Sequence, residues 1–215
     1  MEEINGFIGQ LKPLAELLYF ISAIGLAIFA YIGLQQISIL KSTAATQAKR
    51  DALKLTSEQC SYYSDKIIPR QNEFHRKIKE HNVKFFEGWT VAVQNNQIVA
   101  SRSKPNVLPD FDKALDSLDF LNLMESFSTY FTSRVADEAV AYNSVGVTFL
   151  GACEDVMPWI LTCRKSGYFK NLVKLYILWR TRSDKEKLLL KKLKIDKELA
   201  ETMTTIQSPI GTGAD

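Results

Sequence analysis

The chain reads LLYFISAIGLAIFAYIGLQQISIL over residues 17–40 and carries no formal charge between Glu16 and Lys41. At the rise of an α-helix, residues 17–34 alone extend about 27 Å, close to the roughly 30 Å of hydrocarbon in a bilayer. Uncharged runs of this length are rare in the helices of soluble proteins. The sequence therefore predicts one transmembrane helix over residues 17–40, with a buried helix of a soluble domain as the alternative.

A cleaved signal peptide is a second alternative for this segment. Such a signal has a basic region before its apolar stretch, whereas this N-terminus carries Glu2, Glu3 and Glu16 against Lys12. The one cleavage-like tripeptide, STA at residues 42–44, lies beyond the apolar run. We therefore expect an uncleaved membrane anchor.

The basic residues around the span predict its orientation. Only Lys12 precedes it, and the bases that follow it closely are Lys41, Lys49, Arg50 and Lys54. The positive-inside rule then places the N-terminus outside and the bulk of the chain in the cytoplasm, at the cell inner membrane. The three cysteines form no CxxC motif and are expected to be reduced thiols, which agrees with a cytoplasmic location.

Ala23, Ala27 and Ala30 form a stripe of small residues along the predicted span. Small side chains allow two transmembrane helices to approach closely, so this stripe is a candidate face for self-association. The alternative is that the stripe makes no contact, because small residues are common in single spans. No charged residue lies inside the span, and nothing there indicates a proton relay.

Helical spacing of apolar residues continues from Gln35 to Ile68, so we expect the span to run on as one long helix until Pro69. A second helix is predicted over residues 70–86. Its two histidines, His75 and His81, would lie on nearly opposite faces and are not expected to bind one metal ion.

Residues 89–101, WTVAVQNNQIVAS, form the only strand-like passage of the sequence. Two short β-prone runs flank Asn95 and Asn96, which predicts a small hairpin, with a helix running into a loop as the alternative. A loop at residues 103–109 follows, with two prolines.

The C-terminal half carries three further helical patterns. The first begins at the predicted N-cap Asp110 and ends near Phe131, the second covers residues 137–164 with a kink at Pro158, and the last starts near Tyr168. The fold class is therefore all-α. Its expected parts are a short external N-terminus (1–16), the span (17–40), juxtamembrane helices with the hairpin (41–104), a cytoplasmic helical bundle (105–200) and a flexible tail (201–215).

Charge is arranged in two blocks, because residues 105–163 are strongly acidic and residues 164–197 are strongly basic. On the last helix, lysines gather opposite leucines, as in helices that lie on anionic membranes. Nucleic acid is another possible polyanion, and the basic helix could instead pair with the acidic block. The candidate contacts to an anionic surface are Arg180, Arg182, Lys187, Lys191, Lys192 and Lys194.

Composition and motifs limit the chemistry that the chain can perform. A length of 215 residues with 46% hydrophobic and 24% charged residues excludes a large multidomain enzyme and wholesale disorder. The sequence has no nucleotide-binding, zinc-protease or nucleophile-elbow motif, so we expect no catalytic residue, cofactor or metal. Glu154 and Asp155 are adjacent and point apart on a helix, and we expect them to pair with Arg164 or Arg134.

Three stretches carry a resemblance: LNLMESFSTYF at residues 121–131, DEAVAYNSVGVTFLGACEDVMPWILTCR at 137–164 and YFKNLVKLYILWR at 168–180. The chain resembles a loose group of uncharacterised bacterial single-span membrane proteins with a cytoplasmic helical domain. The matching positions are Glu154, Pro158, Arg164 and Trp179. The resemblance covers most of the chain but transfers no functional residue, and it implies an association with mobile elements or phage defence.

The sequence thus predicts a membrane-anchored, non-enzymatic interaction or effector protein that acts through a cytoplasmic helical domain and self-association, as a homo-oligomer or with a cytoplasmic protein partner. The alternative is a tethered module that binds anionic lipid or nucleic acid through the basic C-terminal helix.

Overall fold

The computed structural model describes the backbone of residues 2–103 and 116–202, and the side chains of residues 13–103 and 118–201. The chain divides into an N-terminal unit, Met1–Ala52, and a C-terminal unit, Leu53–Asp215. The predicted N-cap Asp110, most of the predicted loop at 103–109 and nearly all of the predicted tail lie outside the described residues.

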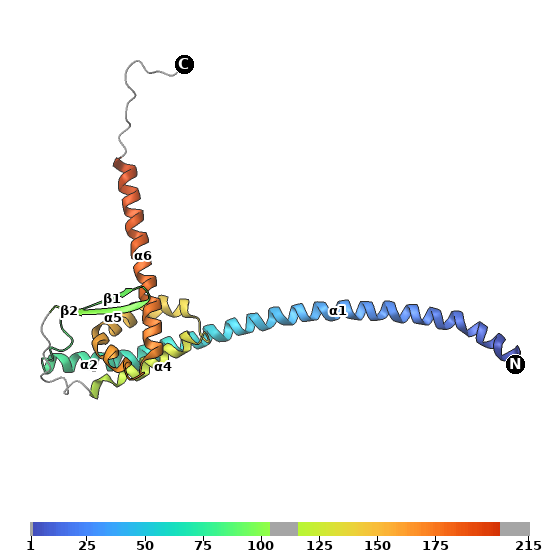
Figure 1. Cartoon of the computed structure of the whole chain (residues 1–215), viewed down its shortest axis with the longest axis horizontal. Helices are drawn as coiled ribbons and strands as arrows, with labels where there is room; N and C mark the ends of the chain where they lie inside the picture. The colour runs from blue at the N-terminus through green and yellow to red at the C-terminus, as the bar shows by residue number, and fades with distance from the viewer. Residues whose placement is uncertain (1, 104–115, 203–215) are drawn as a thin grey trace, which may run out of the picture. The chain divides into compact units, whose positions relative to one another are not determined.

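Helix α1 covers Glu2–Tyr62 and supplies the whole described part of the N-terminal unit (blue to cyan in Figure 1). It begins at Glu2, so the residues expected to form a short external N-terminus are helical. By length and composition, α1 is able to span a membrane, as the sequence predicts. No residue of its most apolar 18-residue stretch is buried. Helix α5, Glu138–Arg164, is also long and apolar enough to span a membrane. However, 56% of its most apolar 18-residue stretch is buried inside the C-terminal unit, as expected of a core helix.

The helical run does not stop at Pro69, and that prediction was wrong. Helix α1 passes into a π-helical turn, Tyr63–Ile67, and then directly into α2, Ile68–Glu80. The backbone N–H of Ile68 donates to the carbonyl of Tyr63, five residues back. Pro69 then falls in the first turn of α2, a position where its missing N–H is tolerated.

Helix α2 ends at Glu80, earlier than predicted, in a left-handed cap. Asn82 has φ = 50°, and the N–H of Val83 donates to the carbonyl of Ile78 at 2.9 Å. This is the Schellman arrangement, in which asparagine replaces the more common glycine. The chain therefore leaves the helix before Phe85, which is buried in the core.

The predicted hairpin is confirmed. Strands β1, Trp89–Gln94, and β2, Gln97–Arg102, pair antiparallel. Asn95 and Asn96 have φ values of 50° and 61°, as the two central residues of a type I′ turn require. The indole N–H of Trp89 donates to the carbonyl of Phe85 at 2.9 Å and fixes the start of the hairpin to the preceding loop.

Helices α4, α5 and α6 follow. A 3₁₀ turn, Asp116–Asp119, precedes α4, Phe120–Thr132, which begins later than predicted. Helix α5 matches its prediction: Asp137 caps it by accepting from the N–H of Val140 at 3.1 Å, and the helix runs on through Pro158. Helix α6 is a single helix, Lys170–Thr202.

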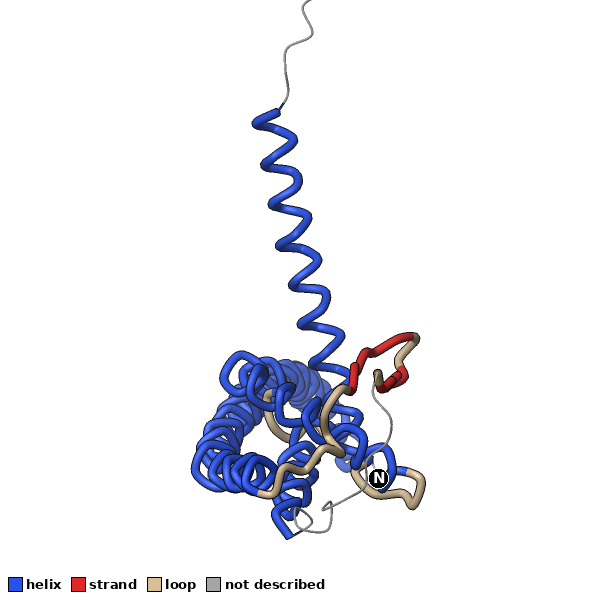
Figure 2. The backbone as a smooth tube through the Cα atoms, turned by 90° about the vertical axis from the view of Figure 1, so that its left-hand side faces the viewer, coloured by secondary structure: helices blue, strands red, loops and turns tan. Residues whose placement is uncertain are grey.

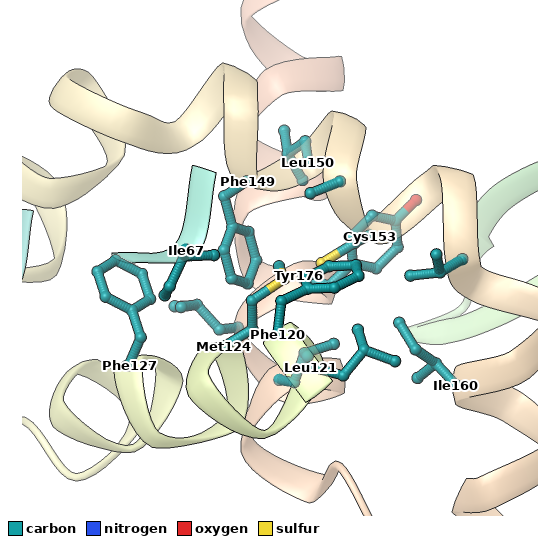
Figure 3. Packing of buried hydrophobic residues seen from close by; sticks show 14 of the residues in the cluster. Ile67, Phe120, Leu121, Met124, Phe127, Phe149, Leu150, Cys153, Ile160 and Tyr176 are labelled. Atoms are coloured by element: carbon teal, nitrogen blue, oxygen red, sulfur yellow. The ribbon is translucent and has the colours of Figure 1, made fainter. Parts of the chain in front are cut away.

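One core joins the elements of the C-terminal unit. It includes side chains from the π turn, α2, α4, α5 and the first half of α6. Figure 3 labels some of those from the π turn, α4, α5 and α6. Tyr63, Phe127, Phe149 and Trp179 form an aromatic cluster, with ring centroids 5.0 Å apart for Tyr63–Phe127 and 4.8 Å apart for Phe149–Trp179. The core thus crosses the position near residue 105 where the sequence suggested a boundary. The predicted all-α fold class with one small hairpin is confirmed.

Candidate interaction surfaces

Two arginines in the first half of α6 pair with acids of α5. The guanidinium of Arg180 lies 2.5 Å from Glu154 of α5, and also 3.2 Å from Asp184 of α6 itself. That of Arg182 lies 2.6 Å from Glu138 and stacks over the ring of Tyr142 at 4.8 Å. Both arginines are half-buried, so the structure engages these two of the six predicted anionic-surface residues inside the domain.

The adjacent acids Glu154 and Asp155 were predicted to pair with Arg164 or Arg134, and this prediction was wrong. Glu154 pairs with Arg180, and Asp155 lies 3.4 Å from the ring of His75 on α2. Burial raises the pKa of Asp155, while the neighbouring His75 acts in the opposite direction. These two acids therefore join helices to one another.

Glu125 on α4 binds the first turn of α6. One carboxylate oxygen accepts from the backbone N–H of Asn171 at 3.0 Å and from its side-chain amide at 3.1 Å. The other accepts from the backbone N–H of Leu172 at 2.7 Å. Because the first N–H groups of a helix have no partner within the helix, this carboxylate caps α6 and complements its dipole.

The second half of α6 is exposed, although at its start the hydroxyl of Tyr142 on α5 donates to Glu186 at 2.7 Å. Every residue from Lys185 to Glu201 is exposed, and this part of the helix extends beyond the other elements of the unit (Figure 2). Ion pairs on this segment join residues of the same helix, as between Lys194 and Glu198 at 3.8 Å. Six large apolar side chains of this segment are more than half exposed: Leu188, Leu189, Leu190, Leu193, Ile195 and Leu199. We call these six residues the apolar residues of distal α6.

The predicted lysine face lies on the same segment. Lys187, Lys191, Lys192 and Lys194 are all exposed, and of these four Lys194 is paired on the surface with Glu198. On α1, Ala23, Ala27 and Ala30 are exposed too and follow one another at helical spacing. Nothing approaches within 4 Å of the position that a side chain would take at Gly25 or Gly33.

The described residues contain no group of three or more His, Cys, Asp or Glu side chains that could hold a metal ion. Cys60, Cys153 and Cys163 are free thiols, as expected. Burial raises the pKa of Cys153 well above its usual value, and the nearby acids Glu154 and Asp155 raise it further. This thiol is therefore protonated at neutral pH and is suited to packing.

No protein-family model, no curated protein and no solved structure matches this chain. The resemblance to uncharacterised bacterial single-span proteins therefore stays a prediction. Sequence reasoning missed the role of Glu125, because its partners lie more than forty residues further along the chain. An acid in the middle of a helix carries no local signal that it caps another helix.

Proposed function

We propose that this protein is a non-enzymatic interaction or effector module, anchored in the inner membrane by α1 with its N-terminus outside. The helical domain then lies in the cytoplasm and acts by self-association. Support comes from the length and apolar character of α1, from the basic residues that follow the span, and from the exposed apolar surface of distal α6. From the resemblance stated above, we include a role in phage defence or on a mobile element.

The observation that carries this proposal is the exposure of the apolar residues of distal α6. Leu188 is 66% exposed and Leu193 is 65% exposed, although both belong to a long, well-formed helix. Burying a leucine side chain contributes about 1.5–3 kcal/mol, and short isolated helices are marginal in water. Packing against the same helix of a second copy would both bury these leucines and stabilise the segment.

The small-residue stripe on α1 offers a second contact for the same assembly. Ala23, Ala27 and Ala30 would let two spans approach closely inside the bilayer, where packing and not hydrophobic burial drives association. In an effector, assembly through both helices would bring several spans together. Perturbation of the bilayer would then follow from the assembly itself.

The test is the mass of the full chain in a mild detergent, measured by light scattering. We expect the wild type to be a dimer or larger. Changing Leu188, Leu193 and Leu199 to serine should reduce it to a monomer if distal α6 carries the contact. Changing Ala23, Ala27 and Ala30 to leucine should do so if the span carries it. The matched control is Val147→Ser, because Val147 is 87% exposed but lies on α5.

A monomeric wild type at all concentrations would contradict the proposal. So would a mass that none of the helix variants lowers. If the Val147→Ser control also lost assembly, removal of an exposed apolar residue elsewhere would have the same effect. The contact could then not be assigned to distal α6.

The lysine face favours a second function, the binding of anionic lipid. Each cation near an anionic surface contributes about 1 kcal/mol, and these four lysines are exposed on a segment with apolar neighbours. In nanodiscs that contain anionic lipid, amides of distal α6 should exchange hydrogen more slowly than in neutral nanodiscs. Exchanging Lys187, Lys191, Lys192 and Lys194 for glutamine should remove the difference, and salt should weaken it. Equal exchange in both lipids would exclude lipid contact and leave nucleic acid as the remaining polyanion.

A further inference from the structure

Within the C-terminal unit, a cavity of about 420 Å³ lies between residues 53–65 and α5, but a larger one, about 610 Å³, lies beside α6. Three elements of the C-terminal unit form this larger cavity: the turn of the hairpin at Asn96, the end of α4, and one face of α6. The hairpin runs close to α6 in this region (Figure 1). Lys174, Leu178 and Lys185 recur at helical spacing, so α6 presents a single continuous face to the cavity. The volume is within the range of sites for small ligands.

Among the described residues, the charged side chains that line this cavity are all cations. Arg134 contributes from the end of α4, and Lys174, Arg182 and Lys185 contribute from α6. Arg182 is already paired with Glu138. Within the described ranges, the other three have no ion pair, and no carboxylate lines the cavity. Like charges gathered at one concave surface create a positive potential that attracts an anion.

The remaining wall of the cavity is largely apolar. Phe131 forms part of it at the end of α4, and Ile177 and Leu178 lie on the face of α6. Leu178 is 47% exposed, although its helical neighbours Leu175 and Trp179 are fully buried. Such a wall can pack against an apolar or aromatic body while the cations hold a charged group. The site therefore suits a ligand with both parts.

We infer that this cavity binds a phosphate monoester that carries an apolar or aromatic body. A phosphate monoester has a charge of about −1.5 to −2 at neutral pH and three strong acceptor oxygens, which matches several unpaired cations better than a single carboxylate does. Two sources share this chemistry: a soluble nucleoside monophosphate and the headgroup of a lipid such as phosphatidic acid. The inference does not depend on self-association, because none of the cavity residues belongs to the apolar residues of distal α6.

The test uses the full chain in nanodiscs of phosphatidylcholine, titrated with adenosine monophosphate in a calorimeter at constant ionic strength. A second arm incorporates phosphatidic acid into the nanodiscs and follows hydrogen exchange over residues 174–185. Binding of the nucleotide identifies a soluble ligand, and protection by phosphatidic acid alone identifies a lipid headgroup. Either result supports a phosphate site, provided that it depends on the cavity cations.

That dependence is measured with Arg134→Glu combined with Lys174→Glu. Both residues are exposed, so the variant should fold, which far-ultraviolet circular dichroism will check. Charge-assisted hydrogen bonds contribute about 1.5–3 kcal/mol each, so we expect roughly a hundredfold weaker binding. The matched control is Lys66→Glu with Lys79→Glu, which changes the net charge equally at exposed sites away from the cavity. Binding in neither arm would overturn the inference, as would an equal loss in the control.

Discussion

Replacing Trp179 with alanine is expected to lower the free energy of unfolding of the C-terminal unit by about 3–5 kcal/mol, the range for large aromatic residues removed from a core. Trp179 is fully buried on α6. The centroid of its ring lies 4.8 Å from the ring centroid of Phe149 and 5.8 Å from that of Tyr142. Truncation would leave a cavity where α4, α5 and α6 meet.

The loss includes a polar contribution. The indole N–H of Trp179 donates to Glu138 at 2.5 Å, and the same carboxylate pairs with Arg182. Alanine would remove the donor and leave one oxygen of a partly buried acid without a partner, which adds to the cost of the cavity. Trp179→Phe keeps most of the volume but not the donor, and its effect should therefore be intermediate.

Urea unfolding of the full chain in a non-ionic detergent measures this effect. The described N-terminal unit is a single helix without tertiary contacts of its own, so the cooperative transition reports the C-terminal unit. Tyr168→Ala is the matched control, because Tyr168 is an aromatic residue that is 64% exposed, and its change should stay within about 0.5 kcal/mol. Equal shifts for Trp179→Ala and Tyr168→Ala would contradict the core described above.

The parts of the fold that were predictable from sequence are those with local signals. Asn95 and Asn96 tolerate the positive φ values of a type I′ turn, so the hairpin could be predicted between two β-prone runs. Asp137 is a good N-cap, and a basic residue followed by Ser166 and Gly167 indicates a helix end, so the bounds of α5 agree with the structure.

The errors occurred where a local signal had two structural solutions. Pro69 breaks most helices, but a π turn before it shifts the hydrogen-bond pattern and lets the helical run continue. Asn82 ends α2 in a left-handed conformation, which asparagine adopts less often than glycine and which the apolar spacing up to Phe86 concealed.

For the surfaces too, the features with a local sequence signal were predictable and those that depend on distant residues were not. The lysine face of distal α6 could be predicted from the helical wheel, because the spacing of lysines and leucines along one helix is a local signal. Arg180 and Arg182 were grouped with it, yet the structure pairs them with Glu154 and Glu138, which lie far away in sequence. The cavity cations come from the end of α4 and from α6, so only the folded chain brings them together.

The cap that Glu125 provides leads to the second large effect. Glu125→Ala is expected to lower the free energy of unfolding of the C-terminal unit by about 3 kcal/mol, because hydrogen bonds to a charged group contribute about 1.5–3 kcal/mol each. The change would leave the N–H groups of Asn171 and Leu172 without their acceptor at the start of α6. It would also remove a negative charge from the positive end of the helix dipole.

Urea unfolding gives the size of the effect, and hydrogen exchange locates it. In Glu125→Ala the amides of Asn171 and Leu172 should exchange faster than in the wild type, whereas Glu125→Gln, which retains one acceptor oxygen, should show a smaller change in both measurements. Glu58→Ala is the control, since Glu58 is exposed and its pair with Lys54 at 4.0 Å is a surface contact that contributes at most about 0.5 kcal/mol. If Glu125→Ala cost no more than Glu58→Ala, the carboxylate would not cap α6. The first turn of that helix would then be held by the burial of Leu172 and by the hydrogen bonds of the Asn171 side chain with Thr129 and Thr132.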